Sequence, residues 1–168
     1  MGVGRAPTPP SEGVIVVAPE VELPGTQMVT VINPDTGEAE LVEVEITFGP
    51  GKAVGIVEND EAIEVFRLIG AFQDSGYPGS FLGFQTNALI GDETRPIVKT
   101  ARGSRIEDPL VTDGVALIPG DDVFLSVVPG EVTQNPDHYD VGGSVLLRVG
   151  YAMSTNKIAL VPDFRVRL

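Results

Sequence analysis

The sequence contains no cysteine and no tryptophan, and its 168 residues include a single histidine, His138. Without cysteine the chain forms neither disulfides nor thiolate metal sites. A single histidine excludes any site that needs two imidazoles from the same chain. The absence of tryptophan, with only three tyrosines, also weakens the case for sugar binding by ring stacking.

Basic residues are scarce as well. The chain has 11 Lys and Arg against 24 Asp and Glu, which gives a net charge of −13. Binding nucleic acid regardless of sequence requires Lys and Arg against phosphates, so this charge argues against a nucleic-acid partner. The acidity is uneven, because residues 1–64 hold 12 of the acidic residues and only two basic ones, Arg5 and Lys52. Such an asymmetry is typical of an acidic, soluble surface or of a side turned toward a partner.

Long apolar runs are missing too. No stretch approaches the roughly 20 apolar residues of a membrane helix, and we expect no signal peptide. Residues 1–13 combine glycine and proline with almost no apolar side chains. We therefore predict an extended N-terminal arm over residues 1–13 and one domain over residues 14–168.

The chain is instead rich in short apolar stretches separated by turn residues, with 20 glycines and 14 prolines. Residues 145–153 alternate in hydrophobicity, which predicts a strand that buries one face. The side chains assigned to that face are Val145, Leu147, Val149, Tyr151 and Met153. Gly150, on the opposite face, indicates a bend or the close approach of another backbone. A second alternating run follows over residues 158–168.

The clearest hairpin joins residues 27–32 to residues 39–48 through a turn at residues 33–37, Asn-Pro-Asp-Thr-Gly. Its second strand places apolar side chains on one face, namely Val42, Val44, Ile46 and Phe48. Glu43, Glu45 and Thr47 occupy the other face. This pattern predicts a strand that is half buried and half solvated in an antiparallel sheet.

Shorter apolar runs complete the prediction. We expect further strands at residues 14–17, 53–57, 84–90, 96–101, 115–118 and 122–128, and residues 61–69 fit a strand better than a short helix. Turn residues recur every 8–12 positions, and no long helix is indicated. The sequence therefore predicts an all-β fold, a single jelly-roll β-barrel or sandwich of about 8–10 antiparallel strands.

An unusual stretch over residues 71–84 interleaves aromatic rings with glycine. Its aromatic residues are Phe72, Tyr77, Phe81 and Phe84. Because aromatics are enriched at the centres of interfaces, the four could form a contact surface. They could equally fold over one end of the β-barrel as part of its core.

Candidate catalytic or metal-binding groups are few. Asp137, His138 and Asp140 could hold a divalent ion, or provide a base with its orienting acid. However, the preceding residues form an ordinary turn sequence, and calcium-type sites need six or more oxygen ligands, so we expect a solvated loop. Ser80 and Ser144 lie outside any Gly-x-Ser-x-Gly motif. We expect no catalytic residues, no metal and no cofactor, hence a protein that is not an enzyme.

Three features together resemble a known family: the barrel-like strands at residues 143–153 and 157–168, the Gly/Pro-rich start at residues 2–10 and the hairpin around residues 33–37. They are similar to the small single-β-barrel (vertical jelly-roll) capsid proteins of tailless icosahedral bacteriophages with an internal membrane, of the Thermus-phage type. The resemblance spans the whole chain in length and pattern.

The resemblance implies a viral coat subunit in the virion, made in the host cytoplasm. Such a subunit would contact itself and a second, larger coat protein, and would lie near an internal viral membrane without inserting into it. Exchange of the N-terminal arm would give a homodimer. Three lysines beside eight arginines fit a thermostable protein. The competing hypothesis is a carbohydrate-binding or adhesin-type β-sandwich module that uses the four aromatic residues.

Overall fold

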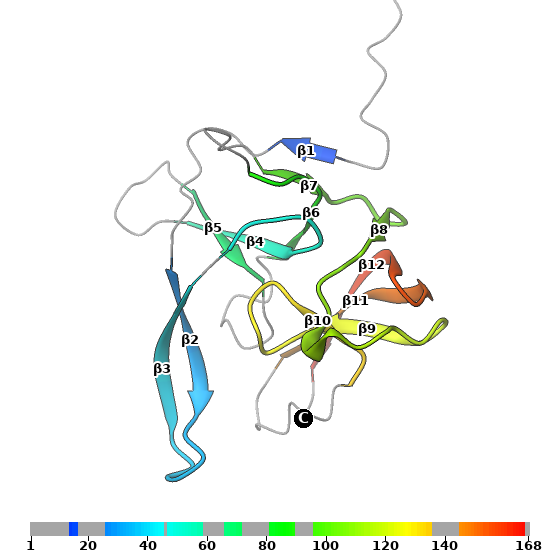
Figure 1. The fold of residues 1–168 in the computed structure, drawn as a ribbon. Coiled ribbons are helices and arrows are strands. Elements are labelled where there is room, and N and C mark those ends of the chain that lie inside the picture. The colour runs from blue at the N-terminus through cyan, green and yellow to red at the C-terminus, as the bar shows by residue number, and fades with distance from the viewer. Residues whose placement is uncertain are drawn as a thin grey trace, which may run out of the picture.

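The computed structural model describes residues 14–16, 26–45, 47–58, 66–71, 81–89, 96–135 and 145–166. Apart from one 3₁₀ turn at Thr112–Gly114, every regular element in these residues is a β-strand, and all paired strands are antiparallel. The predicted all-β, antiparallel fold is therefore confirmed (Figure 1). No helix among the described residues is long and apolar enough to span a membrane.

The strands form two five-stranded sheets and one separate hairpin. The first sheet has the order β1 (Val14–Val16), β7 (Ile97–Lys99), β6 (Phe81–Gln85), β4 (Ala53–Glu58) and β5 (Phe66–Gly70). The second has the order β10 (Val132–Thr133), β9 (Asp122–Leu125), β11 (Val145–Ser154), β12 (Lys157–Val166) and β8 (Arg105–Glu107). The hairpin consists of β2 (Thr26–Ile32) and β3 (Ala39–Glu45).

Both five-stranded sheets contribute to one core. Ala53 and Phe84 from the first sheet belong to the same buried apolar cluster as Leu147, Val149 and Leu160 from the second. No ladder among the described strands joins the two sheets, so they form a sandwich and do not close into a barrel. The chain contributes β4–β7 to the first sheet and then crosses after Lys99 to build the second from β8–β12.

A β-bulge in β11 corrects the predicted core face of that strand. Leu147 and Val149 are buried as expected, but Tyr151 and Met153 are exposed, and Ala152 is buried in their place. The pairing of β11 with both neighbours shifts by one residue between Arg148 and Gly150. Because side chains alternate with period two, a one-residue shift moves every following side chain to the opposite face.

The strand predicted at residues 115–118 is wrong. Ile118 lies in a loop, where the Gln134 side chain accepts from the Ile118 amide at 2.7 Å and donates to its carbonyl at 3.0 Å. A side chain therefore supplies the hydrogen bonds that a neighbouring strand would have given. The short strands β8 and β10 were not predicted, because two or three residues are too few to display an alternation.

The strand predicted at residues 84–90 is displaced toward the N-terminus. It runs from Phe81 to Gln85, and Asn87 then takes over the pairing, since its Oδ1 accepts from the amide of Ile97 at 2.7 Å. In the ambiguous segment, residues 66–69 are indeed in a strand, β5, while residues 61–65 lie outside the described residues. The N-terminal arm, residues 1–13, lies outside them as well.

Candidate interaction surfaces

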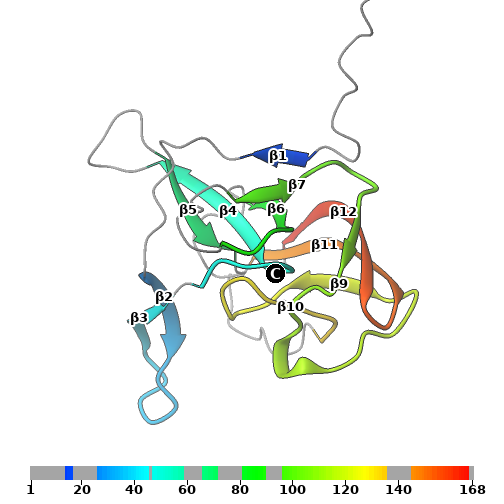
Figure 2. The same ribbon diagram turned by 45° about the horizontal axis from the view of Figure 1, so that its top comes forward.

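The β2–β3 hairpin stands apart from the sandwich, and among the described strands β2 and β3 pair only with each other (Figures 1 and 2). Its turn forms as the sequence predicts. The Asn33 side chain accepts from the amide of Asp35 at 2.8 Å, and the Asn33 carbonyl accepts from the amide of Gly37 at 2.8 Å. Gly37 has a φ of 71°, a conformation that favours glycine. These contacts fix the register from Ile32–Ala39 at the tip to Thr26–Glu45 at the base.

The exposure of the hairpin corrects part of the predicted half-buried strand, because Val42 is exposed on the face expected to be buried, whereas Val44 and Phe48 are half-buried as expected. The described part of β3 is exposed except for Val44, which is half-buried. Leu41 is 68% exposed, and Met28 on the neighbouring strand is 52% exposed. Met28 pairs with Glu43, two positions from Leu41, so Met28 and Leu41 are diagonal neighbours on one face. We call the face that carries Met28, Leu41, Glu43 and Glu45 the open face.

The opposite face of the hairpin is covered near the base of β2. Val29 and Gln27 are buried there, whereas Val31 and Val42 remain exposed. An isolated two-stranded hairpin is marginally stable in water. Burial of Val29 therefore anchors the base of the hairpin, while the open face retains apolar side chains in contact with solvent.

The hairpin is also strongly acidic. Residues 26–45 contain five acidic residues and no basic one, and on the open face Glu43 lies opposite Met28 while Glu45 lies next to it toward the base of the hairpin. Protein–protein interfaces combine buried apolar side chains with charged and polar ones at their margin. Among the described strands, no third strand pairs with the outer edge of β2 or of β3. Unpaired edges are where further strands can be added.

A second charged surface lies where the chain crosses between the two sheets. Residues 96–106 carry Lys99, Arg102 and Arg105 and no acidic residue, and both arginines are exposed. We call these three residues the basic corner. Of the nearby acidic residues, Glu107 is 3.7 Å from the ammonium of Lys157, and Asp108 accepts a hydrogen bond from the Asn156 side chain at 3.0 Å. Because Glu107 lies against Lys157, its single negative charge does not neutralise the three basic side chains of the corner.

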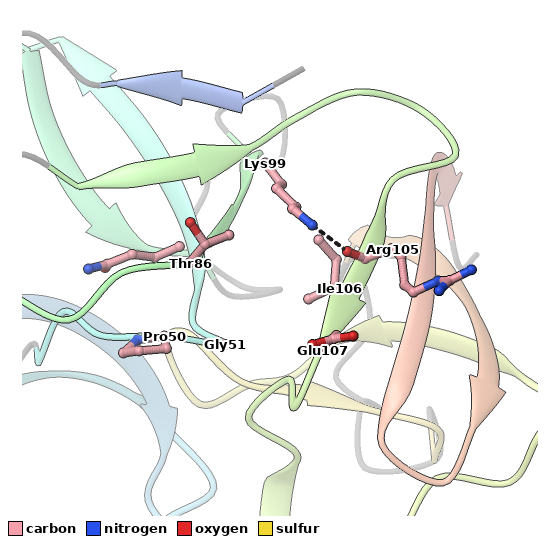
Figure 3. Close-up of a pocket in the computed structure, with 8 residues that line it drawn as sticks. Pro50, Gly51, Thr86, Lys99, Arg105, Ile106 and Glu107 are labelled. Atoms are coloured by element: carbon pink, nitrogen blue, oxygen red, sulfur yellow. Dashed lines mark hydrogen bonds between the residues drawn. The ribbon is translucent and has the colours of Figure 1, made fainter. Parts of the chain in front are cut away.

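A pocket of about 160 Å³ lies beside the basic corner (Figure 3). Lys99 reaches across it to donate to the carbonyl of Arg105 at 3.0 Å, and the guanidinium of Arg105 points away from it. Gln85 lines the pocket, and its buried Oε1 has no hydrogen-bond partner among the described residues. Small-molecule sites usually exceed about 300 Å³.

The aromatic residues expected at residues 71–84 divide into two groups. Phe84 is fully buried in the core, and Phe81 packs edge-on against it with ring centroids 5.8 Å apart. These two rings follow the core alternative, since a fully buried Phe84 presents no surface to a partner. Phe72 and Tyr77 lie outside the described residues, as do Asp137, His138 and Asp140. Within the described part of the chain, no three His, Asp or Glu side chains gather in a way that could hold a metal ion.

Lys52 lies at the foot of the hairpin, where the chain enters β4. Its aliphatic stem lies close to Gly130, and its ammonium donates to the Thr47 hydroxyl at 2.7 Å. Partial burial lowers the pKa of Lys52 below its ordinary value, and the carboxylate of Glu131 opposes this shift.

Comparisons of the chain with protein-family models, with curated proteins and with solved structures found no match. The functional argument therefore depends on the hairpin and the basic corner. Sequence reasoning identified the hairpin and assigned Val42, Val44, Ile46 and Phe48 to a buried face, but it did not single out Leu41 or Met28. It did not single out the basic corner, although the acid-free run at residues 96–106 is visible in the sequence.

Proposed function

We propose that this chain is a viral coat subunit, which assembles an icosahedral capsid through surface contacts with itself and with a partner coat protein. The exposed hairpin carries the proposal. A two-stranded sheet with apolar side chains on its open face gains stability when a neighbour covers it. Leu41 and Met28 are placed where a neighbouring subunit would bury them, each with a gain of about 1–2 kcal/mol.

The rest of the molecule fits a structural role. The sandwich has a continuous core to which both sheets contribute, so it forms a stable body from which a contact element can project. Exchange of the N-terminal arm, residues 1–13, between two copies would give a homodimer without a newly evolved interface. In this proposal the subunit has no active site, and its loops and edges are its functional parts.

The carbohydrate-binding alternative receives less support. It depends on aromatic rings that stack against a sugar, and the rings of Phe81 and Phe84 belong to the core or pack against it. The fully buried ring of Phe84 offers no open face to a ligand, and the ring of Phe81 is partly buried against it, while Phe72 and Tyr77 lie outside the described residues. The observations thus favour a surface that binds protein over one that binds sugar.

The proposal can be tested by light scattering and electron microscopy. We expect the purified chain to have at least a dimeric mass at high concentration and to form ordered sheets or shells when concentrated further. The double variant Met28→Ser/Leu41→Ser should associate more weakly while its melting temperature stays unchanged. The matched control is Val115→Ser/Ile118→Ser, which removes exposed apolar side chains from a distant loop. A monomeric mass at every concentration would contradict the proposal.

A further inference from the structure

Charge is segregated between two ends of the molecule. The hairpin, residues 26–45, carries five acidic side chains without a basic one, while residues 96–106 carry three basic side chains without an acidic one. The hairpin and the β7–β8 connection lie on opposite sides of the sandwich in both views (Figures 1 and 2). One chain cannot bring these two surfaces together, but two copies can.

Pairing of two hairpins is the simplest alternative, and charge argues against it. If the open face met its own copy, Glu43 and Glu45 of each subunit would approach the same carboxylates of the other. Like charges brought together at an interface repel and so disfavour that arrangement. The open face therefore requires a partner surface with positive charge.

We propose that the open face of the hairpin docks on the basic corner of a second copy, in a head-to-tail contact. Met28 and Leu41 would be buried at the centre, while Glu43 and Glu45 would lie against Arg102 and Arg105 of the next subunit. The contact rests on the proposed function and specifies the surfaces by which copies meet. In a head-to-tail pair one open face and one basic corner remain unoccupied, so further copies can add and the contact propagates into rings or arrays.

The size of the hairpin sets the strength of this contact. Seven residues in each strand give a face about 23 Å long, at about 3.3 Å per residue. Such a narrow face covers less than the roughly 800 Å² per partner of a standard interface. Each contact is therefore weak on its own, and many repeated contacts hold an assembly together. Because much of the attraction is electrostatic, the contact should weaken as salt rises.

The test is charge reversal followed by mixing. The hairpin variant is Glu43→Lys/Glu45→Lys, and the corner variant is Arg102→Glu/Arg105→Glu. The control Asp121→Lys makes the same charge change per substitution as the hairpin variant, at an exposed site elsewhere. Dissociation constants are measured by sedimentation equilibrium at low and high salt, and circular dichroism melts establish that each variant is folded. We expect each reversal alone to weaken association about tenfold or more. An equimolar mixture of the two variants should form heterodimers, because the reversed hairpin meets the reversed corner.

The outcomes separate this inference from the function on which it rests. If the wild-type chain associates but neither reversal weakens it, the head-to-tail contact is refuted and the coat function stands. If the hairpin reversal weakens association but the mixture is not restored, the basic corner is not the partner surface, and the inference is again refuted. If the wild-type chain stays monomeric at every salt and protein concentration, both proposals fail.

Discussion

Replacing Gly150 with alanine should strongly destabilise the sandwich. Gly150 lies at the bulge in the middle of β11, between β9 and β12. A Cβ atom added there overlaps the carbonyl oxygen of Ala159 and lies 2.9 Å from its carbonyl carbon and 3.1 Å from the amide nitrogen of Val161. These atoms are backbone, so they can move only if β12 shifts. Overpacking costs about 1–3 kcal/mol, and each ladder hydrogen bond lost costs about 1 kcal/mol more.

We therefore expect Gly150→Ala to lose about 3–5 kcal/mol of unfolding free energy, measured by urea denaturation. The melting temperature should fall by about 10 °C, at about 2–4 °C per kcal/mol for a chain of this size. Gly49→Ala is the matched control, because an added Cβ there meets nothing within 4 Å. The control should change stability by less than about 0.5 kcal/mol. A loss below about 1 kcal/mol for Gly150→Ala would refute the close approach of the two strands.

Two further predictions concern the hairpin and its foot. Asn33→Ala removes the hydrogen bond from the Asp35 amide to the Asn33 side chain, so hydrogen exchange at Asp35 should quicken about fivefold. This rate change corresponds to a loss of ~1 kcal/mol in the free energy of local opening at the turn, while the global melting temperature stays unchanged. Faster exchange throughout the sandwich would contradict this. Burial lowers the pKa of Lys52, so the folded chain releases this proton at a lower pH than the unfolded chain does. Stability from this group therefore rises with pH up to the ordinary value of 10.5, and Lys52→Met should remove that rise in urea titrations at alkaline pH.

Local chemistry was enough to predict the tip of the hairpin. The turn at residues 33–37 forms because Asn33 bonds to the following amides and Gly37 adopts a positive φ, and both properties belong to those residues alone. The same holds for the alternation of Leu147 and Val149, which are buried as predicted. Where a rule depends only on neighbours in sequence, the prediction and the structure agree.

Interactions between distant residues account for the errors. Tyr151 and Met153 were assigned to the core because a regular alternation of side chains does not reveal a β-bulge. Gly150 was the residue of this run that indicated where the strand departs from regular pairing. Residues 115–118 have strand composition, but Gln134, from a distant segment, occupies the hydrogen-bonding groups of Ile118. The core position of Phe84 likewise depends on packing between the two sheets, which no local pattern specifies.

The misplaced hairpin strand is the most informative of these differences. The alternation of β3 correctly indicates side chains suited to burial, but a periodic pattern does not tell whether the covering surface belongs to the same chain or to another. In the structure Val42 on the face predicted to be buried stays exposed, and so do Leu41 and Met28 on the opposite face, which the alternation assigned to solvent. Exposed apolar side chains on a projecting hairpin are explained most simply by a neighbouring molecule that covers them. The argument for assembly therefore comes from the structure of the hairpin, because the alternation does not single out Leu41 and Met28.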